Sequence, residues 1–248
     1  MISIKTEREL DLMRKAGRVV AITLQEIETA IKPGITTARL DDIAERTLRK
    51  LGAQPAFKGY NGFPATICAS INEQVVHGIP GARRLKEGDI VSIDIGSIVE
   101  GYFGDAAITV AVGEVAPEVE ELIRITRECL DRAIEAARVG CHLGNISHAI
   151  QAHAESHGFS VVRQYVGHGI GTSMHEEPPV PNYGKPTRGP ILQPGMTLAI
   201  EPMVNMGTFE VYTLPDHWTV VTRDGKYSAH FEHTVAITAG GPEILTKG

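Results

Sequence analysis

The sequence has few of the residues that mark several large classes of protein. Its three cysteines, Cys68, Cys129 and Cys141, form no Cys-x-x-Cys pair and leave an odd count, so we expect no disulfide framework. No apolar run approaches the roughly 18 residues that span a bilayer, and the charged first residues do not resemble a secretory signal. Lys and Arg total 24 against 30 Asp and Glu, which leaves no basic excess for nucleic acid. We therefore expect a cytoplasmic protein that binds neither membrane nor nucleic acid directly.

Sequence motifs for nucleophilic and nucleotide chemistry are absent as well. The chain has no Gly-x-Ser-x-Gly turn, no P-loop and no Gly-x-Gly-x-x-Gly motif opening a helix. Cys68 lies between Ile67 and Ala69, which predicts a buried, unreactive thiol. The sequence thus gives no support to a hydrolase triad or to a nucleotide or dinucleotide site.

Helical and strand-like patterns alternate along the 248 residues. Thr6 and Glu9 fit a capping box, and apolar residues at helical spacing continue to the stop signal Lys32-Pro33-Gly34. A second helix should end at Gly52, a third should cover residues 120–139, and a fourth should end at Gly158. The clearest strands are residues 89–95 and 107–112, which are β-branched and bounded by glycines.

Two spacings repeat between the halves of the chain. Gly34 to Gly52 and Gly140 to Gly158 both span 18 residues. The segment from Leu85 to Asp94 matches the segment from Leu192 to Glu201 at an offset of 107. We therefore predict one domain over residues 1–248 with an internal duplication, roughly 6–112 and 118–239. Its fold class should be α+β, with two helix-helix-strand halves about a pseudo-twofold axis.

Four acids stand in apolar strand sequence, where unpaired charge is costly: Asp94, Asp105, Glu201 and Glu232. Any one of them could end a strand or pair with a basic residue. However, residues 90–99 and 197–206 contain no Lys or Arg, so a metal cation is the other compensation. His168, in a glycine-rich segment, is the expected nitrogen ligand, and four negative charges match two divalent ions. Oxygen-rich ligation with one imidazole favours Mn, Fe(II), Co or Zn.

The other histidines have weaker contexts. His153 and His157 do not fit His-Glu-x-x-His because Ala154 follows the first, so we expect a solvated helix face. His230 and His233 flank Glu232, and strand alternation suggests that both point away from it as packing or supporting groups. His77 and His175 lie in Gly- and Pro-rich turns, where functional side chains are common.

Taken together, these motifs resemble the type I methionine aminopeptidases over essentially the whole chain. Asp94 and Asp105 are eleven residues apart, His175 follows His168 by seven, and Glu201 precedes Pro202. The resemblance implies the pita-bread α+β fold, in which both halves surround a central antiparallel sheet. It implies a dinuclear metal centre bridged by two of its five ligands, Asp105 and Glu232. The implied ligands are Asp94, Asp105, His168, Glu201 and Glu232.

The resemblance also implies substrate contacts. His77 and His175 would contact the substrate, and a backbone site around Asn72, Gln74 and Ser228 would hold a monovalent cation, Na or K. The positions that match the methionine side-chain pocket are Tyr60, Phe63, Cys68, Met174 and Trp218, with Phe57 nearby. Soft thioether–aromatic contacts suit such a pocket.

The implied activity is metal-dependent removal of the N-terminal methionine from nascent proteins and peptides when the second residue is small. Glu201 would move a proton from water to the leaving amine, and His175 would stabilise negative charge on the carbonyl oxygen. His77 would hydrogen-bond the scissile amide. The implied partners are nascent N-termini and the ribosome, and the implied state is a cytoplasmic monomer.

Three alternatives stay open. Prolidase-like and creatinase-like enzymes share the fold, but usually carry an extra N-terminal domain, and here the first helix begins near Thr6. A type II methionine aminopeptidase has a helical insertion in its second half, for which we see no segment. A non-catalytic binding protein on this scaffold would have lost ligands, whereas all five are present.

Overall fold

The computed structural model describes residues 1–247, and all four predicted helices are present. They are α1 (Glu7–Ala30), α2 (Thr37–Lys50), α3 (Pro117–Ala136) and α4 (Gly144–Ser156), with a short 3-10 turn η1 (Tyr60–Gly62). The capping box of α1 is confirmed, because Glu9 N–H donates to Thr6 Oγ1 and Thr6 N–H donates to Glu9 Oε2. Helix α3 begins three residues before the predicted start and ends three residues before the predicted end. Its first turn contains Pro117, at a position where proline is favoured.

The strands form one large and two small antiparallel sheets within residues 1–247. The large sheet has the order β1-β4-β5-β14-β9-β7-β8, with β2 on β4 and β15 on β14. The small sheets have the orders β13-β10-β6 and β11-β12-β3. The strands are β1 (Gln54–Pro55), β2 (Ile67–Ile71), β3 (Gln74–Val76), β4 (Ile90–Val99), β5 (Tyr102–Ala111), β6 (Ser160–Val161), β7 (Gly167–Gly169), β8 (Glu176–Val180), β9 (Thr197–Ile200), β10 (Met203–Asn205), β11 (Val211–Thr213), β12 (Val220–Thr222), β13 (Ser228–His230), β14 (Glu232–Thr238) and β15 (Gly241–Ile244).

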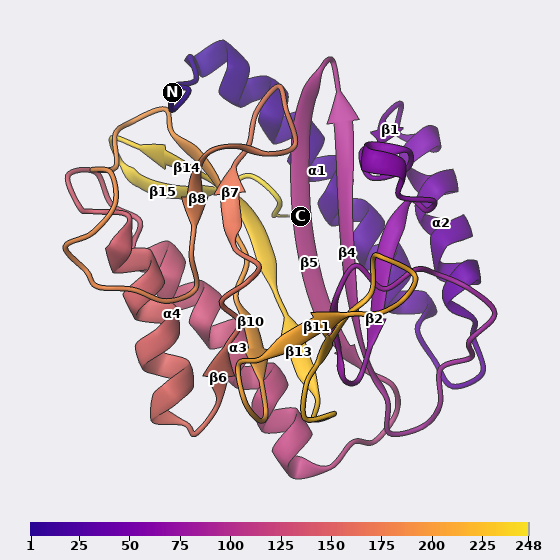
Figure 1. Ribbon diagram of the computed structural model, residues 1–248. Helices are drawn as coiled ribbons and strands as arrows, with labels where there is room; N and C mark the ends of the chain where they lie inside the picture. Colours follow the sequence, from indigo (N-terminus) through magenta and orange to yellow (C-terminus); the bar gives the residue numbers. More distant parts are fainter. Residues whose placement is uncertain (248) are drawn as a thin grey trace.

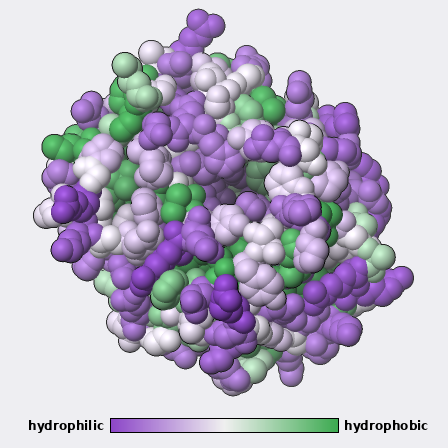
Figure 2. All heavy atoms as spheres, viewed as in Figure 1, coloured by the Kyte–Doolittle hydropathy of each residue, from purple (hydrophilic) through white to green (hydrophobic). Residues whose placement is uncertain are grey.

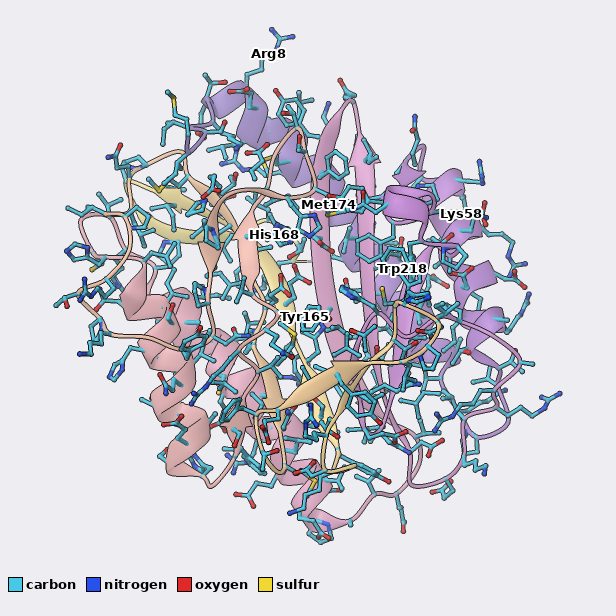
Figure 3. All side chains as sticks on the ribbon, viewed as in Figure 1. Arg8, Lys58, Tyr165, His168, Met174 and Trp218 are labelled. Atoms are coloured by element: carbon cyan, nitrogen blue, oxygen red, sulfur yellow. The ribbon has the colours of Figure 1, made fainter. Side chains whose placement is uncertain are left out.

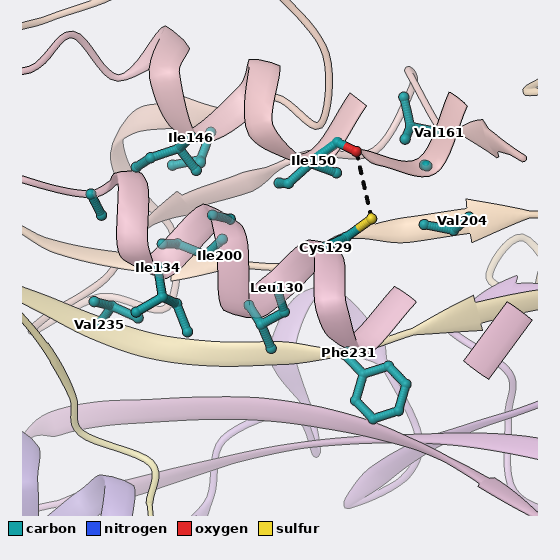
Figure 4. Close-up of a cluster of buried hydrophobic side chains, with 14 of the residues drawn as sticks. Cys129, Leu130, Ile134, Ile146, Ile150, Val161, Ile200, Val204, Phe231 and Val235 are labelled. Carbon is teal, nitrogen blue, oxygen red and sulfur yellow. Dashed lines mark hydrogen bonds between the residues drawn. The ribbon is translucent and has the colours of Figure 1, made fainter. Parts of the chain in front are cut away.

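The helices cover one face of the large sheet in two pairs (Figure 1). Helices α1 and α2 bury Val20, Leu24 and Leu40 against Ile93 and Ile95 of β4. Helices α3 and α4 pack on the other half of the sheet, and Figure 4 shows Cys129 and Ile150 within that cluster. The α+β class with a central antiparallel sheet is therefore confirmed. The domain bounds and the internal duplication stay predictions from the repeated spacings.

The contact between α3 and α4 changes one expectation. His153 is buried, and its Nε2 lies 2.8 Å from Glu128 Oε2 on α3, so its assignment to a solvated face was wrong. The ring lies between the two packed helices because it can donate to Glu128 there. His157, one turn later, is exposed as expected. No helix among residues 1–247 is long and apolar enough to cross a bilayer.

We expect the α3 side of the core to respond strongly to truncation. Leu122 is fully buried, so Leu122→Ala should lower the free energy of unfolding by about 2–5 kcal/mol through lost burial and a residual cavity. The neighbouring exposed Glu121→Ala should change it by less than about 0.5 kcal/mol. Urea titrations of both variants measure the difference, and equal effects would contradict the described packing.

Candidate metal centre and substrate pocket

The four predicted acids lie on one face of the large sheet, opposite the helices. On β4, Asp94 alternates with Ile93 and Ile95, whose side chains pack under α1 and α2, so its carboxylate points the other way. Strand register brings the acids together, because Ala107 of β5 pairs with Asp94 on one side and with Glu232 on the other. The small side chain of Ala107 leaves the space between them open.

Two further strand positions complete the group of acids. Asp105 stands two residues before Ala107 and therefore shares its face of the sheet. Glu201 follows directly on β9, whose Ile200 pairs with His233 of β14, so Glu201 lies beside Glu232. The structure thus brings all four acids together, although they come from four segments of the chain.

His168 on β7 faces this group. Its Nε2 lies 3.6 Å from Glu201 Oε1 and 4.0 Å from Asp105 Oδ2. Its Nδ1 lies 2.9 Å from Gly169 O, which can only accept, so Nδ1 carries the proton and Nε2 is free as a ligand. Burial lowers the pKa of His168 to about 4, which keeps the imidazole neutral. Ligand atoms of Asp105, His168 and Glu232 all lie within 4.8 Å of one another.

The acids are poorly compensated by the rest of the protein. Within residues 1–247, Asp94 Oδ1, Asp105 Oδ1 and Glu232 Oε1 are buried without a hydrogen-bond partner. No Lys or Arg nitrogen in the described chain lies within 4.0 Å of these carboxylates. Desolvation raises the pKa of Asp94 to about 7. Desolvation and the other carboxylates raise the pKa values of Asp105 and Glu232 well above their usual range.

These orphaned oxygens test whether a metal fits the site. Four carboxylates in one hollow repel one another when ionised, and protons or cations are the two ways to relieve that repulsion. The donors are carboxylate oxygens and one neutral imidazole nitrogen, which suits a first-row divalent ion. The residues present therefore fit a divalent metal centre.

His230 is a neighbour of the acids that the sequence reasoning placed wrongly. Its buried Nε2 lies 4.0 Å from Glu232 Oε2, so it points toward the acid rather than away. Residues two apart in extended chain share a face, and this spacing was the signal that could have found it. His233 does point away, with Nδ1 2.8 Å from Thr246 Oγ1.

Two hydroxyl groups fix the backbone beside the site. Thr234 Oγ1 accepts from the N–H of Asp105 and donates to the carbonyl oxygen of Asp105, which joins β14 to β5. Thr109 Oγ1 forms the same pair of bonds with the backbone of His230 and also contacts Ser92 Oγ. These contacts are not visible in any sequence motif.

A cavity of about 180 Å³ opens onto the acids and His168. Figure 2 shows the corresponding recess near the centre of the face seen in Figure 1, and in Figure 3 His168, Met174 and Trp218 surround it. Cavities of about 150 Å³ hold benzene in other proteins, so this space accommodates a methionine side chain. All five pocket positions implied by the resemblance line it, together with Phe57 and Asn61, the second of which the sequence did not indicate. The full lining is Phe57, Tyr60, Asn61, Phe63, Cys68, His77, Asp94, Asp105, His168, Met174, His175, Glu201, Trp218 and Glu232.

Aromatic contacts shape the apolar end of the cavity. Phe63 meets Trp218 edge-on with ring centroids 5.0 Å apart. Cys68 is buried, and desolvation and the nearby acids raise the pKa of its thiol well above the usual range. The thiol is therefore unreactive and contributes only apolar surface to the cavity. This end therefore offers apolar and aromatic surface without a basic group.

The two turn histidines lie at the mouth of the cavity. Tyr60 Oη is 2.8 Å from His175 Nδ1, and the rings of His175 and His168 are 4.2 Å apart. His77 has a positive φ of 59° and contacts Trp218 and Tyr165 edge-on. Burial lowers the pKa of His77 to about 4, so it is neutral near pH 7.

Asn72, Gln74 and Ser228 lie outside this cavity. The N–H of Ser228 donates to the carbonyl oxygen of Asn72, and Gln74 Oε1 accepts from the N–H of Ile71. This links the end of β2 to β3 and β13. A monovalent cation at this place stays a prediction.

Known proteins resemble the chain over its whole length. Metallopeptidase family M24 matches residues 11–239. Methionine aminopeptidase 1 of Bacillus subtilis is 58% identical over 247 residues, which cover 100% of both chains. Methionine aminopeptidase of Clostridium acetobutylicum is 57% identical, with 99% of each chain covered.

Solved structures agree with the sequence relatives. Methionine aminopeptidase from Thermotoga maritima superposes with a TM-score of 0.99 at 50% identity, covering 100% of both chains. Prolidase from Pyrococcus furiosus has a TM-score of 0.81 at 24% identity and covers 99% of this chain but 65% of its own, so it shows the fold alone. The shared fold is the pita-bread fold, as the sequence resemblance implied. The chain belongs to metallopeptidase family M24, and within it to the type I methionine aminopeptidases.

Proposed function

We propose that this protein hydrolyses the first peptide bond of proteins and peptides that begin with methionine, when the second residue is small. The observation that carries the proposal is the junction of two surfaces in one cavity. An apolar slot lined by Phe63, Cys68 and Trp218 opens directly onto four carboxylates and a neutral imidazole. A side chain held in the slot therefore has its own carbonyl group beside the acids.

We propose five metal ligands for two divalent ions, with Asp105 and Glu232 bridging. The buried unpaired oxygens of Asp94, Asp105 and Glu232 support this assignment. Bound divalent ions would lower the pKa of a water molecule and polarise the substrate carbonyl. Co, Mn, Fe(II) and Zn all accept such donors. The proposed ligands are Asp94, Asp105, His168, Glu201 and Glu232.

Glu201 is the proposed group for proton transfer. Its carboxylate lines the cavity, with Oε1 3.6 Å from His168 Nε2, so it can take a proton from a water molecule held there. The same proton can then pass to the leaving amine, as general base catalysis followed by general acid catalysis requires.

The two histidines at the mouth are proposed to orient the peptide. His175 is held by Tyr60 and can donate a hydrogen bond to the carbonyl oxygen as negative charge develops. His77 lines the same cavity, beside Trp218, and can hydrogen-bond the scissile amide. The preference for a small second residue is proposed from the resemblance to the family.

The wider setting follows from the family and is proposed on that basis. Substrates are nascent polypeptide N-termini, and the protein acts in the cytoplasm as a monomer that works near the ribosome. Asn72, Gln74 and Ser228 are proposed to surround one Na or K ion, because the backbones of Asn72 and Ser228 meet there and Gln74 follows two residues after Asn72.

Metal binding should change the stability of the protein in a pH-dependent way. Because the pKa of Asp94 is raised from 3.8 to about 7, the folded metal-free protein keeps a proton that the unfolded chain releases. The retained proton stabilises the folded metal-free protein, and this stabilisation is lost as the pH rises from about 4 to about 7. A divalent ion can replace the proton above that range. Mn²⁺ should therefore raise the Tm of stripped protein by several degrees at about pH 8 and by much less at about pH 5.

The control variants for this experiment separate ligands from other acids. Asp94→Ala and Glu232→Ala should each lower the metal bound per chain and the Tm shift. The exposed Glu155→Ala should leave both unchanged. Full metal content in either ligand variant would show that the ligand assignment is wrong.

Glu201→Gln should lower kcat by at least about 100-fold, because the amide keeps the size but cannot carry the proton. The measurement is methionine release from Met-Ala-x peptides at saturating metal, with Glu155→Gln as the matched control. Turnover near that of the wild type in metal-loaded Glu201→Gln would contradict the role of Glu201 in proton transfer.

Substrate preference tests the slot independently of the metal. Met-Ala should be cleaved best and norleucine-Ala measurably more slowly, because norleucine loses only the sulfur contacts, worth about 0.3–1.5 kcal/mol each. Lys-Ala should fail because its charge would be buried without a partner. Met-Leu should be refused. The measurement is kcat/KM for each of these peptides and for Ala-Pro. Preference for Ala-Pro would indicate a prolidase-like enzyme. No cleavage of any peptide with metal present would indicate a binding protein.

A further inference from the structure

The loop between β7 and β8 carries two side chains of the cavity, yet one of them is exposed. Met174 is buried and packs against Leu10 and Met13 of α1. His175 lies at the rim with its side chain exposed. Its Nδ1 lies 2.8 Å from the hydroxyl oxygen of Tyr60, which is itself 36% exposed.

Glu176, the residue after His175, closes the loop on itself. Its Oε1 accepts hydrogen bonds from the N–H groups of Thr172 and Ser173, at 2.9 and 3.2 Å. Its Oε2 accepts from Lys5 Nζ, which comes from the segment before α1. The carboxylate of Glu176 therefore binds both the β7–β8 loop, at Thr172 and Ser173, and the segment before α1, at Lys5.

The ion pair between Lys5 and Glu176 is shielded from water. The Lys5 side chain is 3% exposed and that of Glu176 is 14% exposed. Gly171 makes this packing possible, because a Cβ there would collide with the end of the Lys5 side chain and with Glu176. Pairs in such surroundings are screened little by salt, unlike the exposed pairs elsewhere on the surface.

Lys5 is itself fixed on both sides. Its N–H donates to the carbonyl oxygen of Gly195 at 2.7 Å, in the turn that enters β9. The next residue, Thr6, is the N-cap of α1. The ammonium group thus stands on a rigid base formed by α1 and the turn before β9.

We propose that Lys5 and Glu176 are positioning residues, which hold the β7–β8 loop so that His175 keeps its place in the cavity. A buried ion pair stabilises little compared with apolar packing, so precise placement is the better reason for its presence. The inference rests on the proposed function of His175. Displacement of a catalytic group by about 1 Å can cost about 100-fold in rate.

The test is a double-mutant cycle between Lys5 and His175. Lys5→Met keeps the aliphatic stem and should lower kcat for Met-Ala-x by about 10- to 100-fold, with a smaller change in KM. In the His175→Ala background the same substitution should change kcat by less than about twofold, because the group it positions is gone. A merely structural role would give the same loss in both backgrounds, and that result would overturn the proposal.

Two further variants complete the design. Glu176→Gln keeps an oxygen for Thr172 and Ser173 but removes the charge that Lys5 faces, so it should repeat the coupling if Lys5→Met does not fold. Arg14→Gln is the matched control, since Arg14 ties α1 to Glu243 of β15 and no cavity residue. It should leave kcat within about twofold of the wild type.

Hydrogen exchange gives a readout that does not depend on catalysis. In Lys5→Met the amides of Thr172 and Ser173 should exchange faster by at least about tenfold, while Arg14→Gln leaves them unchanged. If wild-type protein released no methionine, the proposed function would fail, and the exchange data would still decide on the loop. Unchanged exchange in Lys5→Met and Glu176→Gln would overturn the proposal.

Discussion

Four carboxylates meet in one poorly solvated hollow, and their mutual repulsion is the constraint on which the rest of the structure depends. Asp94, Asp105, Glu201 and Glu232 cannot all be ionised there without cations, because the described protein offers them no Lys or Arg. Such a cluster persists only on a scaffold rigid enough to impose it. The antiparallel sheet, covered on its other face by two helix pairs, is that scaffold.

The division between the two faces of the sheet separates stability from chemistry. Ile93 and Ile95 pack under the helices, and between them Asp94 points the other way. Likewise, Phe231 packs in the core beneath α3, and the next residue, Glu232, lines the cavity. Strand alternation therefore lets one segment serve the core and the site at once. The hydroxyl oxygens of Thr234 and Thr109 accept hydrogen bonds from the N–H groups of Asp105 and His230, which joins the strands that carry the acids.

Most of the proposed substrate pocket lies on loops, whereas Cys68 lies on β2. Tyr60 and Phe63 come from the turn around η1, Met174 and His175 from the β7–β8 loop, and Trp218 from the segment between β11 and β12. Loops vary in shape more readily than strands, so one scaffold can serve several substrates. For the β7–β8 loop, the proposed anchor is the Lys5–Glu176 pair, whose side chains are 3% and 14% exposed.

The sequence by itself determined the helices, the main strands, the family and the group of acids, because these depend on local periodicity and on motif spacing. Placing His153 depended on tertiary structure, because the neighbouring helix α3 supplies its partner, Glu128. The same holds for Asn61 in the cavity lining and for Lys5 beneath Glu176, which is 171 residues away in the chain. Contacts between distant segments follow from the packing of whole elements, and a local pattern carries no record of them.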